Sequence, residues 1–296
     1  MNILILGSDG FIGRSVASEL AKNTDNNVFR AVYRKGSNNP REVIVDLLSE
    51  ADICQAIATT QPQVIINCAG IVDVTSDVSL NAKFTENIIH QAAKFDCTKT
   101  IIISGSAAEY GKINDNDLPV DEGTPLRANT GYGYSKLIEE KIAHKLQKKC
   151  QKNIIVLRIF NPIGEGMSSR FLVMELLRQT NEIKNGLRKS IDISRLDSKR
   201  DYVSVKDVAR AFRMVAEDNP VQKVYNVGSG VATSNEQLLE LILKGANLDT
   251  RPLIQETSVA PETLVACQAD ITRISKEFGW KPEYNLERSV REIING

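Results

Sequence analysis

Several features that mark particular protein classes are scarce or absent in this sequence. Its 296 residues include only two histidines, His90 and His144, and both fall within helical patterns. This scarcity argues against a Ser-His-Asp mechanism and against a histidine-based metal site, so no metal is expected. Lysine plus arginine equals aspartate plus glutamate at 37 each, which gives no reason to expect nucleic acid or an acidic membrane as a partner.

Cysteine patterns and long apolar runs are also missing. The five cysteines are odd in number and widely spaced, without a CxxC motif. They predict reduced thiols. The longest apolar runs, such as "ILIL", are too short to cross a bilayer. The start "MNILILGSDG" lacks the basic region and the cleavage site of a signal peptide. We therefore expect a cytoplasmic protein that does not enter a membrane.

The first half of the sequence alternates strand-length apolar runs with helical stretches. The runs include "NILIL", "QVIINCAG", "TIIISG" and "NIIVLRIF". Strands without polar alternation, separated by helices, are typical of a parallel sheet that is covered on both faces. We predict an α/β fold, a doubly wound Rossmann domain over residues 1–165. Its ligands should lie beyond the carboxyl ends of the strands.

After Gly164 the rhythm becomes irregular, and no second Rossmann unit is evident. We expect residues 166–296 to form a smaller, irregular α+β domain that binds substrate. Segments near 200–229, "RDYVSVKDVARAFRMVAED" and "VYNVGSG", should return to the first domain. The tail "DITRISKEFGWKPEYNLERSVREIING" predicts two short helices joined by a proline turn.

A glycine turn follows the first predicted strand. Gly7, Gly10 and Gly13 give a G-x-x-G-x-x-G pattern between that strand and a helix. Glycines at this place allow a tight turn, close approach of a pyrophosphate, and close packing of helix on strand. Ordinary turns also contain glycines, but the strand-turn-helix context favours dinucleotide binding.

The end of the second strand bears on which dinucleotide is bound. NAD sites usually have an acidic residue there, whereas this chain has Tyr33, Arg34 and Lys35. A guanidinium suits a 2′-phosphate, so we favour NADP over NAD as cofactor. The alternative is a solvated basic turn.

Tyrosine precedes lysine by four residues at two places, Tyr132/Lys136 and Tyr202/Lys206. The first pair begins a predicted helix, where residues four apart share a face. The second lies in the alternating run "YVSV", and four strand residues span roughly 13 Å. Only the first pair is expected to act as a unit. The Lys136 ammonium should lower the pKa of the Tyr132 phenol toward the working pH. Ser104 and Ser106 end the strand "TIIISG" and supply nearby hydroxyl groups.

These motifs resemble the extended short-chain dehydrogenase/reductase family, the NAD(P)-dependent nucleotide-sugar epimerases, dehydratases and reductases. The resemblance covers nearly the whole chain and depends on eight motifs in the family's order: "GSDGFIG", "NCAG", "SGSAAEYG", "YGYSK", "LRIFNPIG", "RDYVSVKDV", "VYNVGSG" and "FGWKPEYNLERSV".

The resemblance also implies roles for individual residues. Ser106 would orient the substrate, Tyr132 would be the catalytic acid/base, and Lys136 would be its partner. Asn161 and Arg200 would bind substrate, with Arg200 clamping a nucleotide diphosphate. The implied cofactor-binding residues, with Asp46 near the adenine, are Gly7, Gly10, Phe11, Ile12, Gly13, Arg34, Asp46, Leu47, Ala69, Tyr132 and Lys136.

Two departures from family patterns bear on the reaction. Ala107 and Ala108 replace the acidic pair of the sugar 4,6-dehydratases, which argues against an elimination. Ala260, in "VAPETL", replaces an arginine that helps to hold the diphosphate. A basic loop could compensate or could be a solvated surface; it contains Arg188, Lys189, Arg195, Lys199 and Arg200.

We therefore expect NADPH-dependent reduction of the 4-keto group of a nucleotide-activated 4-keto-6-deoxysugar. The alternatives are an NAD-dependent nucleotide-sugar 4-epimerase and a non-catalytic, NADP-sensing scaffold. Family members often pair through the helices equivalent to residues 80–95 and 132–148, so a homodimer is expected.

Overall fold

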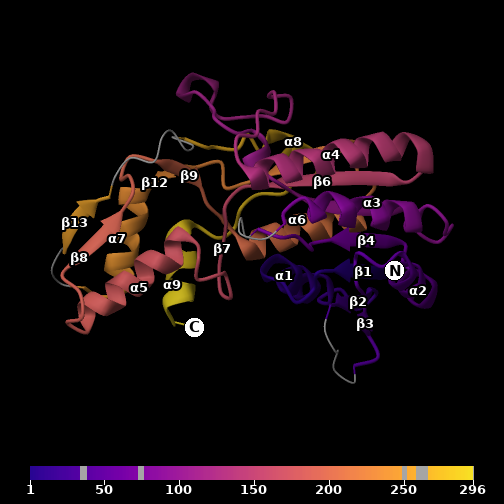
Figure 1. The fold of residues 1–296 in the computed structure, drawn as a ribbon, viewed down its shortest axis with the longest axis horizontal. Coiled ribbons are helices and arrows are strands. Elements are labelled where there is room, and N and C mark those ends of the chain that lie inside the picture. Colours follow the sequence, from indigo (N-terminus) through magenta and orange to yellow (C-terminus); the bar gives the residue numbers. More distant parts are fainter. Residues whose placement is uncertain (34–38, 73–76, 249–251, 258–265, 296) are drawn as a thin grey trace.

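A computed structural model describes residues 1–33, 39–72, 77–248, 252–257 and 266–295. Its centre is a seven-stranded, wholly parallel sheet with the strand order β11-β6-β5-β4-β1-β2-β3 (Figure 1). The strands are β1 (Asn2–Leu6), β2 (Asn27–Val32), β3 (Glu42–Ile44), β4 (Val64–Asn67), β5 (Thr100–Ser106), β6 (Asn153–Ile159) and β11 (Val224–Val227). This architecture confirms the predicted doubly wound fold.

Helices cover both faces of the sheet, and each face has its own apolar core. The helices are α1 (Phe11–Leu20), α2 (Glu50–Thr60), α3 (Leu80–Ala92), α4 (Gly131–Cys150) and α6 (Val205–Glu217). α1 and α6 pack on one face, and α2, α3 and α4 pack on the other. Successive strand residues divide between the cores, since Ile3 and Ile5 join the first and Leu4 and Leu6 the second. Strands buried on both faces need apolar residues at every position, which explains the missing polar alternation.

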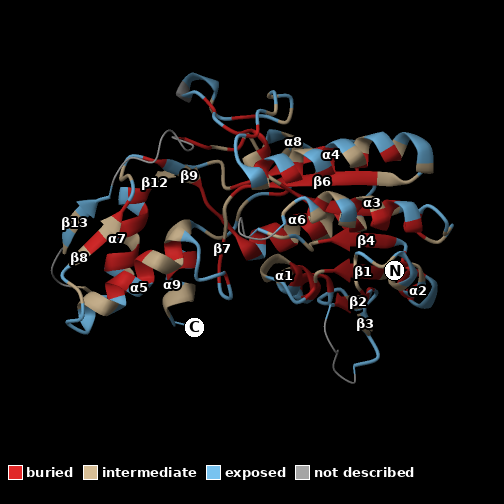
Figure 2. Cartoon of the chain, in the orientation of Figure 1, coloured by how far each residue is buried: buried red, intermediate tan, exposed pale blue. Residues whose placement is uncertain are grey.

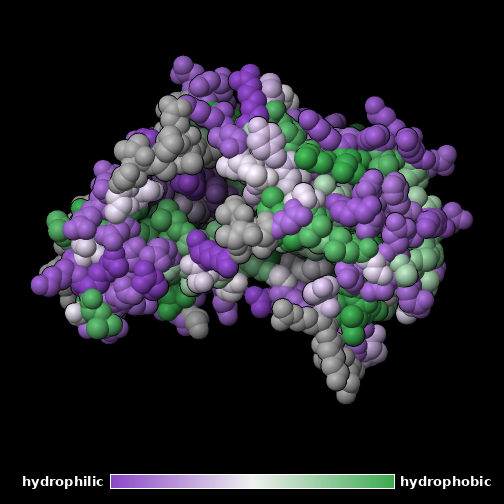
Figure 3. Space-filling view, in the orientation of Figure 1, coloured by the Kyte–Doolittle hydropathy of each residue, from purple (hydrophilic) through white to green (hydrophobic). Residues whose placement is uncertain are grey.

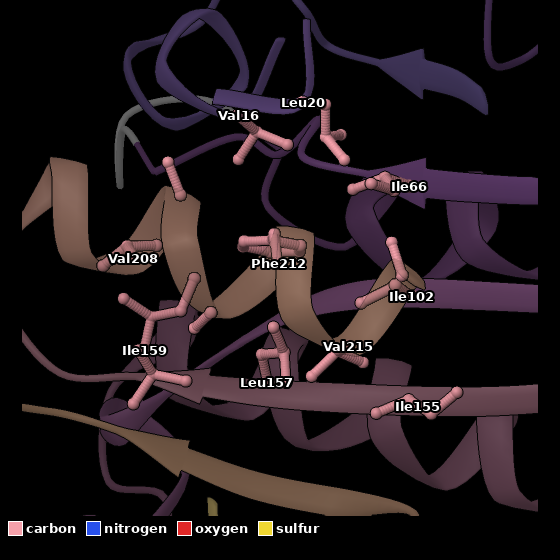
Figure 4. Packing of buried hydrophobic residues seen from close by; sticks show 14 of the residues in the cluster. Val16, Leu20, Ile66, Ile102, Ile155, Leu157, Ile159, Val208, Phe212 and Val215 are labelled. Atoms are coloured by element: carbon pink, nitrogen blue, oxygen red, sulfur yellow. The ribbon is translucent and has the colours of Figure 1, made fainter. Parts of the chain in front are cut away.

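Figure 4 shows how α6 seals one face of the sheet. Val208, Phe212 and Val215 point from the helix toward side chains of β4, β5 and β6. All three are fully buried, and they recur at the spacing of one helical face. The helix comes from a part of the sequence far from those strands, and its packing completes the core of the larger lobe (Figure 2).

A smaller lobe lies beside the sheet (Figure 1). Its helices are α5 (Leu172–Lys184), α7 (Asn235–Gly245) and α9 (Leu286–Asn295), and Leu176, Leu238 and Val290 are buried in its separate core. Its described residues form two-stranded pairs. These strands are β8 (Ser190–Ile193) with β13 (Leu253–Glu256), and β9 (Lys199–Asp201) with β12 (Ala232–Ser234). A further parallel pair joins β7 (Pro162–Ile163) to β10 (Val203–Ser204).

The C-terminal residues divide between the two lobes. α8 (Thr272–Phe278) and the turn at Trp280 pack into the α1/α6 core, although the sequence analysis placed them within the 166–296 domain. The Trp280 indole donates to the Asp207 carbonyl at 3.1 Å, and the Asp207 carboxylate accepts the backbone N–H groups of Glu283 and Tyr284. Asp207 thereby fixes the proline turn against α6.

The second tyrosine-lysine pair has a different local structure from the one expected. Lys206 lies in the first turn of α6 rather than in a continuous strand, because the Ser204 hydroxyl caps that helix. Its ammonium contacts Glu292 at 2.8 Å, while the buried Tyr202 hydroxyl has no hydrogen-bond partner among the described residues. Within the described ranges, no helix has the length and apolar character needed to cross a membrane.

Candidate active site

The glycine turn after β1 is packed too closely for larger residues. Gly7 has φ +74°, and a Cβ there would lie 2.5 Å from the backbone nitrogen of Ala69. A Cβ on Gly13 would lie 2.2 Å from the Gly7 carbonyl oxygen. Gly10 is the N-cap of α1, and its side-chain-free backbone leaves that helix end open. The turn therefore has the tight, uncovered helix terminus that suits a pyrophosphate.

Four other predicted cofactor residues lie on α1 and after β3. Phe11 and Ile12 are the first residues of α1. The Phe11 side chain packs against the core of the smaller lobe and the Ile12 side chain against that of the larger lobe. Their backbone N–H groups are therefore the parts available to a phosphate. Asp46 and Leu47 follow β3 and are partly buried. The Leu47 carbonyl accepts from the Asn87 side chain at 2.9 Å. Tyr33 is 70% exposed, and Arg34 lies outside the described residues.

Tight packing at the start of α4 brings the tyrosine to the serine. The Thr130 hydroxyl caps the helix by accepting from the Gly133 N–H at 3.0 Å. A Cβ on Gly133 would lie 2.5 Å from the Ala108 carbonyl oxygen, so the helix sits directly against the turn η1 (Ala107–Glu109). As a result the Tyr132 phenol lies beside Ser106, which ends β5. The Ser106 hydroxyl also accepts from the Ala108 N–H at 3.2 Å, which leaves its own O–H free to donate.

Lys136 lies one helical turn after Tyr132 and is almost completely buried. Its Nζ donates to the Ser104 carbonyl at 2.9 Å and lies 2.9 Å from Glu139 Oε1. Nothing in the sequence analysis singled out Glu139, although the i, i+3 spacing to Lys136 was a usable signal. Gly70 follows β4, and a Cβ there would lie 3.5 Å from this Nζ.

Burial, and not the ammonium, dominates the acidity of the phenol. Burial raises the pKa of Tyr132; Lys136 and Ser106 lower it, and Glu139 and Glu109 raise it further. The net pKa lies above the ordinary value, so the expected lowering was wrong for the protein without ligand. Burial alone would lower the pKa of Lys136, but Glu139 and Tyr132 raise it. The site therefore holds a neutral phenol beside a charged ammonium.

Two buried carboxyl groups, Glu109 and Glu140, lie next to each other, and Glu109 contacts the backbone of Ser106. The Ser106 N–H donates to Glu109 Oε1 at 2.7 Å, and Glu109 is fully buried beside Glu140. Burial, followed by the Glu140 charge, raises the pKa of Glu109 well above its ordinary value. Burial also acts to raise the pKa of Glu140, but hydrogen bonds with His144 and Arg158 outweigh it and lower that pKa to about 2. Glu109 therefore carries the proton of the pair.

This pair predicts a pH-dependent gain in stability for Glu109→Gln. A group whose pKa is raised on folding loses its stabilising contribution as the pH rises above its unfolded value and through its folded value. Glutamine keeps the acceptor for Ser106 and cannot ionise. We expect the variant to exceed the wild type in unfolding free energy by about 1–3 kcal/mol at about pH 8 and by much less at about pH 4.5. Denaturant unfolding at both pH values measures the difference.

Glu140→Gln is the matched control, because the pKa of Glu140 shifts in the opposite direction on folding. Its carboxylate stabilises the fold above the ordinary carboxyl pKa, and this contribution is lost as the pH falls through about 2. We expect that variant to be less stable than the wild type at about pH 8. An equal gain for Glu109→Gln at both pH values would contradict a Glu109 side chain that is protonated in the folded protein.

The two predicted substrate residues lie where the chain passes between the lobes. The Asn161 amide donates to the Asp201 carbonyl at 2.9 Å. Arg200 lies on β9 and donates to the Ser198 hydroxyl at 3.0 Å. The next residue, Asp201, is buried and accepts from Ser229, Gly230 and Ala269. Figure 3 shows the surface hollowed between the lobes, and these contacts fix the backbone around Arg200.

The basic loop is partly neutralised. Arg188 pairs with Asp192 and Glu182, and Arg195 pairs with Asp197 at 2.6 Å. These ion pairs favour the solvated-surface interpretation for both arginines. Ala260 lies outside the described residues.

Comparison with known proteins places the chain in a family. A profile of the NAD dependent epimerase/dehydratase family matches residues 3–228. The chain belongs to this family. The predicted membership of the extended short-chain dehydrogenase/reductases is thereby confirmed, and with it an NAD(P)-dependent enzyme.

Individual relatives include both epimerases and reductases. A UDP-glucose 4-epimerase of Cyamopsis tetragonoloba is 28% identical, over 98% of this chain and 92% of the relative. The GDP-6-deoxy-D-mannose reductase of Pseudomonas aeruginosa is 24% identical, over 99% of this chain and 96% of the relative. Among solved structures, RMD from P. aeruginosa complexed with NADPH has a TM-score of 0.86 and 24% identity, over 99% of this chain and 97% of that one. The UDP-glucose 4-epimerase of Thermotoga maritima with UDP-glucose has the same TM-score, 21% identity, and coverage of 100% and 98%.

Proposed function

We propose that this protein reduces the 4-keto group of a nucleotide-activated 4-keto-6-deoxysugar with NADPH. The observation that supports reduction most directly is the neutral Tyr132 phenol, which lies beside Ser106 and the Lys136 ammonium. Reduction of a ketone requires a proton donor at the start of the reaction, and a neutral phenol meets that need. Oxidation of a sugar hydroxyl, the first step of a 4-epimerase, requires a base instead.

The cofactor site fits a dinucleotide. The cradle formed by Gly7, Gly10 and Gly13 would hold the pyrophosphate, and Asp46, Leu47 and Ala69 would border the adenosine half. A third N–H of Lys136 is available for a ribose hydroxyl. When bound, NADPH would supply the hydride for C4. The choice of NADPH rests on Tyr33, Arg34 and Lys35, which replace the acidic residue of NAD sites.

Three residues of the chain would carry out the remaining steps of the reduction. Tyr132 donates a proton to the C4 oxygen, and Ser106 donates a hydrogen bond to the same oxygen as its negative charge develops. Lys136 favours the phenolate that remains after proton transfer. Ala107 and Ala108 carry no group that could remove a proton for elimination, so we do not expect dehydration.

Substrate recognition is assigned to the smaller lobe. We propose that residues 166–296, apart from the segments packed on the sheet, form the substrate-binding domain and that residues 1–165 bind the dinucleotide. Arg200 would hold the nucleotide diphosphate and Asn161 would contact the sugar. We also propose a cytoplasmic homodimer that pairs through α3 and α4, where Tyr134 and Ile138 are exposed.

The test is a substrate panel. The purified protein is incubated with NADPH and with 4-keto-6-deoxysugars carrying dTDP, GDP, CDP or UDP, and the loss of reduced-nicotinamide absorbance is followed. We expect oxidation of NADPH with one of these sugars and a slower reaction with NADH. If no member of the panel consumes either cofactor, the reductase proposal fails.

A 4-epimerase is the second candidate, favoured by the similarity to the C. tetragonoloba UDP-glucose 4-epimerase. It would be isolated with tightly bound NAD and would interconvert a UDP-sugar without added cofactor. Mass spectrometry of the cofactor released by denaturation separates the two candidates. A non-catalytic sensor would need none of Ser106, Tyr132 and Lys136, and their presence together counts against it.

A further inference from the structure

Glu139 is buried directly beside the proposed catalytic lysine. Its side chain is 2% exposed, and Oε1 lies 2.9 Å from Lys136 Nζ. The other oxygen, Oε2, accepts from the Thr85 hydroxyl of α3 at 2.9 Å. Thr85 in turn accepts from the Asn67 amide at the end of β4 at 3.4 Å. The carboxylate is therefore held by contacts from α4 and α3, and Asn67 of β4 supports the Thr85 contact.

The Lys136 ammonium has two fixed partners, the Ser104 carbonyl and the Glu139 carboxylate. One N–H goes to the Ser104 carbonyl, and the Glu139 carboxylate is an ion-pair partner 2.9 Å from Nζ. An ammonium has three donors, so these two contacts leave at least one N–H available. Gly70 lies close to Nζ and has no side chain to cover it. The two fixed partners thus hold Nζ at one place while its third N–H stays available on the Gly70 side.

The charge of Glu139 also offsets that of Lys136. A buried ammonium without a counter-charge would strongly favour ionisation of a neighbouring phenol. With the carboxylate 2.9 Å away, the pair is neutral as a whole, and its effect on Tyr132 is much weaker. This offset matters only if Tyr132 must start the reaction protonated, so the inference rests on the proposed reductase function.

We propose that Glu139 is a positioning residue that fixes the Lys136 ammonium and sets the upper limit of the pH range in which Tyr132 can donate its proton. The charged and titratable groups that face this pair come from several elements. Around Tyr132 and Lys136, Glu139 lies on α4, Glu109 lies on η1, and Cys68 directly follows β4. Ser106 and Ser104 on β5 and Thr85 on α3 complete the polar surroundings.

The directions of the pKa shifts support this assignment. Burial lowers the pKa of Lys136, and Glu139 contributes most to raising it again. Glu139 also acts to raise the pKa of Tyr132, against the lowering effect of Lys136. Loss of the carboxylate should therefore lower both values.

The test replaces Glu139 by glutamine, which keeps the shape and removes the charge. Ionisation of Tyr132 is followed by phenolate absorbance in the protein without substrate, and the same titration of Tyr132→Phe in each background isolates this tyrosine from the other six. We expect the Tyr132 titration to move down by about one pH unit. At the highest pH at which circular dichroism shows both proteins folded, the phenolate fraction should then be about tenfold larger in Glu139→Gln.

The kinetic counterpart is the basic limb of kcat/KM with the active sugar, which should move down by a similar amount. Glu19→Gln is the matched control, since Glu19 is also a largely buried glutamate but lies near the end of α1 and pairs with Lys22 and Arg213 rather than with Lys136. It should lose stability without moving the limb. Glu139→Asp keeps the charge and should keep the limb near its wild-type position.

The outcomes separate this proposal from the proposed function. An unchanged Tyr132 titration in Glu139→Gln, or an equal change in Glu19→Gln, overturns the role of Glu139 whether or not a substrate is known. A uniform loss of activity at all pH values, with no movement of the limb, also overturns it and indicates a structural role. Failure of the whole sugar panel would overturn the reductase function and leave the spectroscopic result intact.

Discussion

Tyr132→Phe should lower kcat for the proposed reduction by about 10³-fold and leave NADPH binding nearly unchanged. The substitution removes one oxygen atom, which lies beside Ser106 and is proposed to supply the proton for the C4 oxygen. General acid catalysis by a positioned side chain contributes about 10²–10⁴-fold, so its loss accounts for an effect of this size. Single-turnover kinetics with the active sugar give kcat, and nicotinamide fluorescence gives the dissociation constant.

Tyr134→Phe is the control for this prediction. Tyr134 lies two residues later on the same helix, but its side chain is 54% exposed and faces away from the site. We expect that variant to keep wild-type kcat and stability. A Tyr132→Phe enzyme that retained more than about a tenth of wild-type kcat would show that another group donates the proton. Retained binding with lost turnover would distinguish an enzyme from a sensor, which should tolerate both substitutions.

The fold was predictable because its main signal is local. Each central strand is buried on both faces, so runs such as Asn2–Leu6 and Val64–Asn67 are apolar at nearly every position. Helical periodicity between them fixes a parallel arrangement, since parallel strands need crossover connections. The packing of α8 on the larger lobe was not predictable in this way. It depends on Trp280 and Asp207, which meet across 73 residues.

The sequence was sufficient to predict which residues form the candidate site, but not the direction in which the pKa of Tyr132 is shifted. Tyr132 and Lys136 share a helix, and the start of that helix is encoded by Thr130 and Gly133. The acidity of the phenol depends instead on burial and on carboxylates from two elements, Glu109 and Glu139. Lys136 does act to lower the pKa of the phenol, but burial outweighs it, so the net shift is opposite to the one expected from the nearest charge alone. Arg34 and Ala260, which bear on cofactor and substrate choice, lie outside the described residues.

The second large effect is expected from Arg158→Met, which should lower the unfolding free energy by about 3–5 kcal/mol. Arg158 lies on β6 with its side chain 4% exposed and binds both oxygens of Glu140, at 2.6 and 2.9 Å. It also donates to the Tyr110 hydroxyl at 2.9 Å. Methionine fills similar volume but leaves the Glu140 carboxylate buried without its counter-charge. Urea unfolding at neutral pH measures the loss.

Arg178→Met is the control, because Arg178 also contacts two carboxylates, those of Glu175 and Glu182, but is 53% exposed on α5. Water screens exposed ion pairs, so we expect little change in stability there. A loss for Arg158→Met no greater than that for Arg178→Met would contradict the prediction. Adding Glu140→Gln to Arg158→Met should recover part of the loss, since no uncompensated charge then remains in the core. That recovery would show that the arginine serves chiefly to neutralise Glu140, the neighbour of Glu109, and the same double variant would show how far turnover depends on this buried pair.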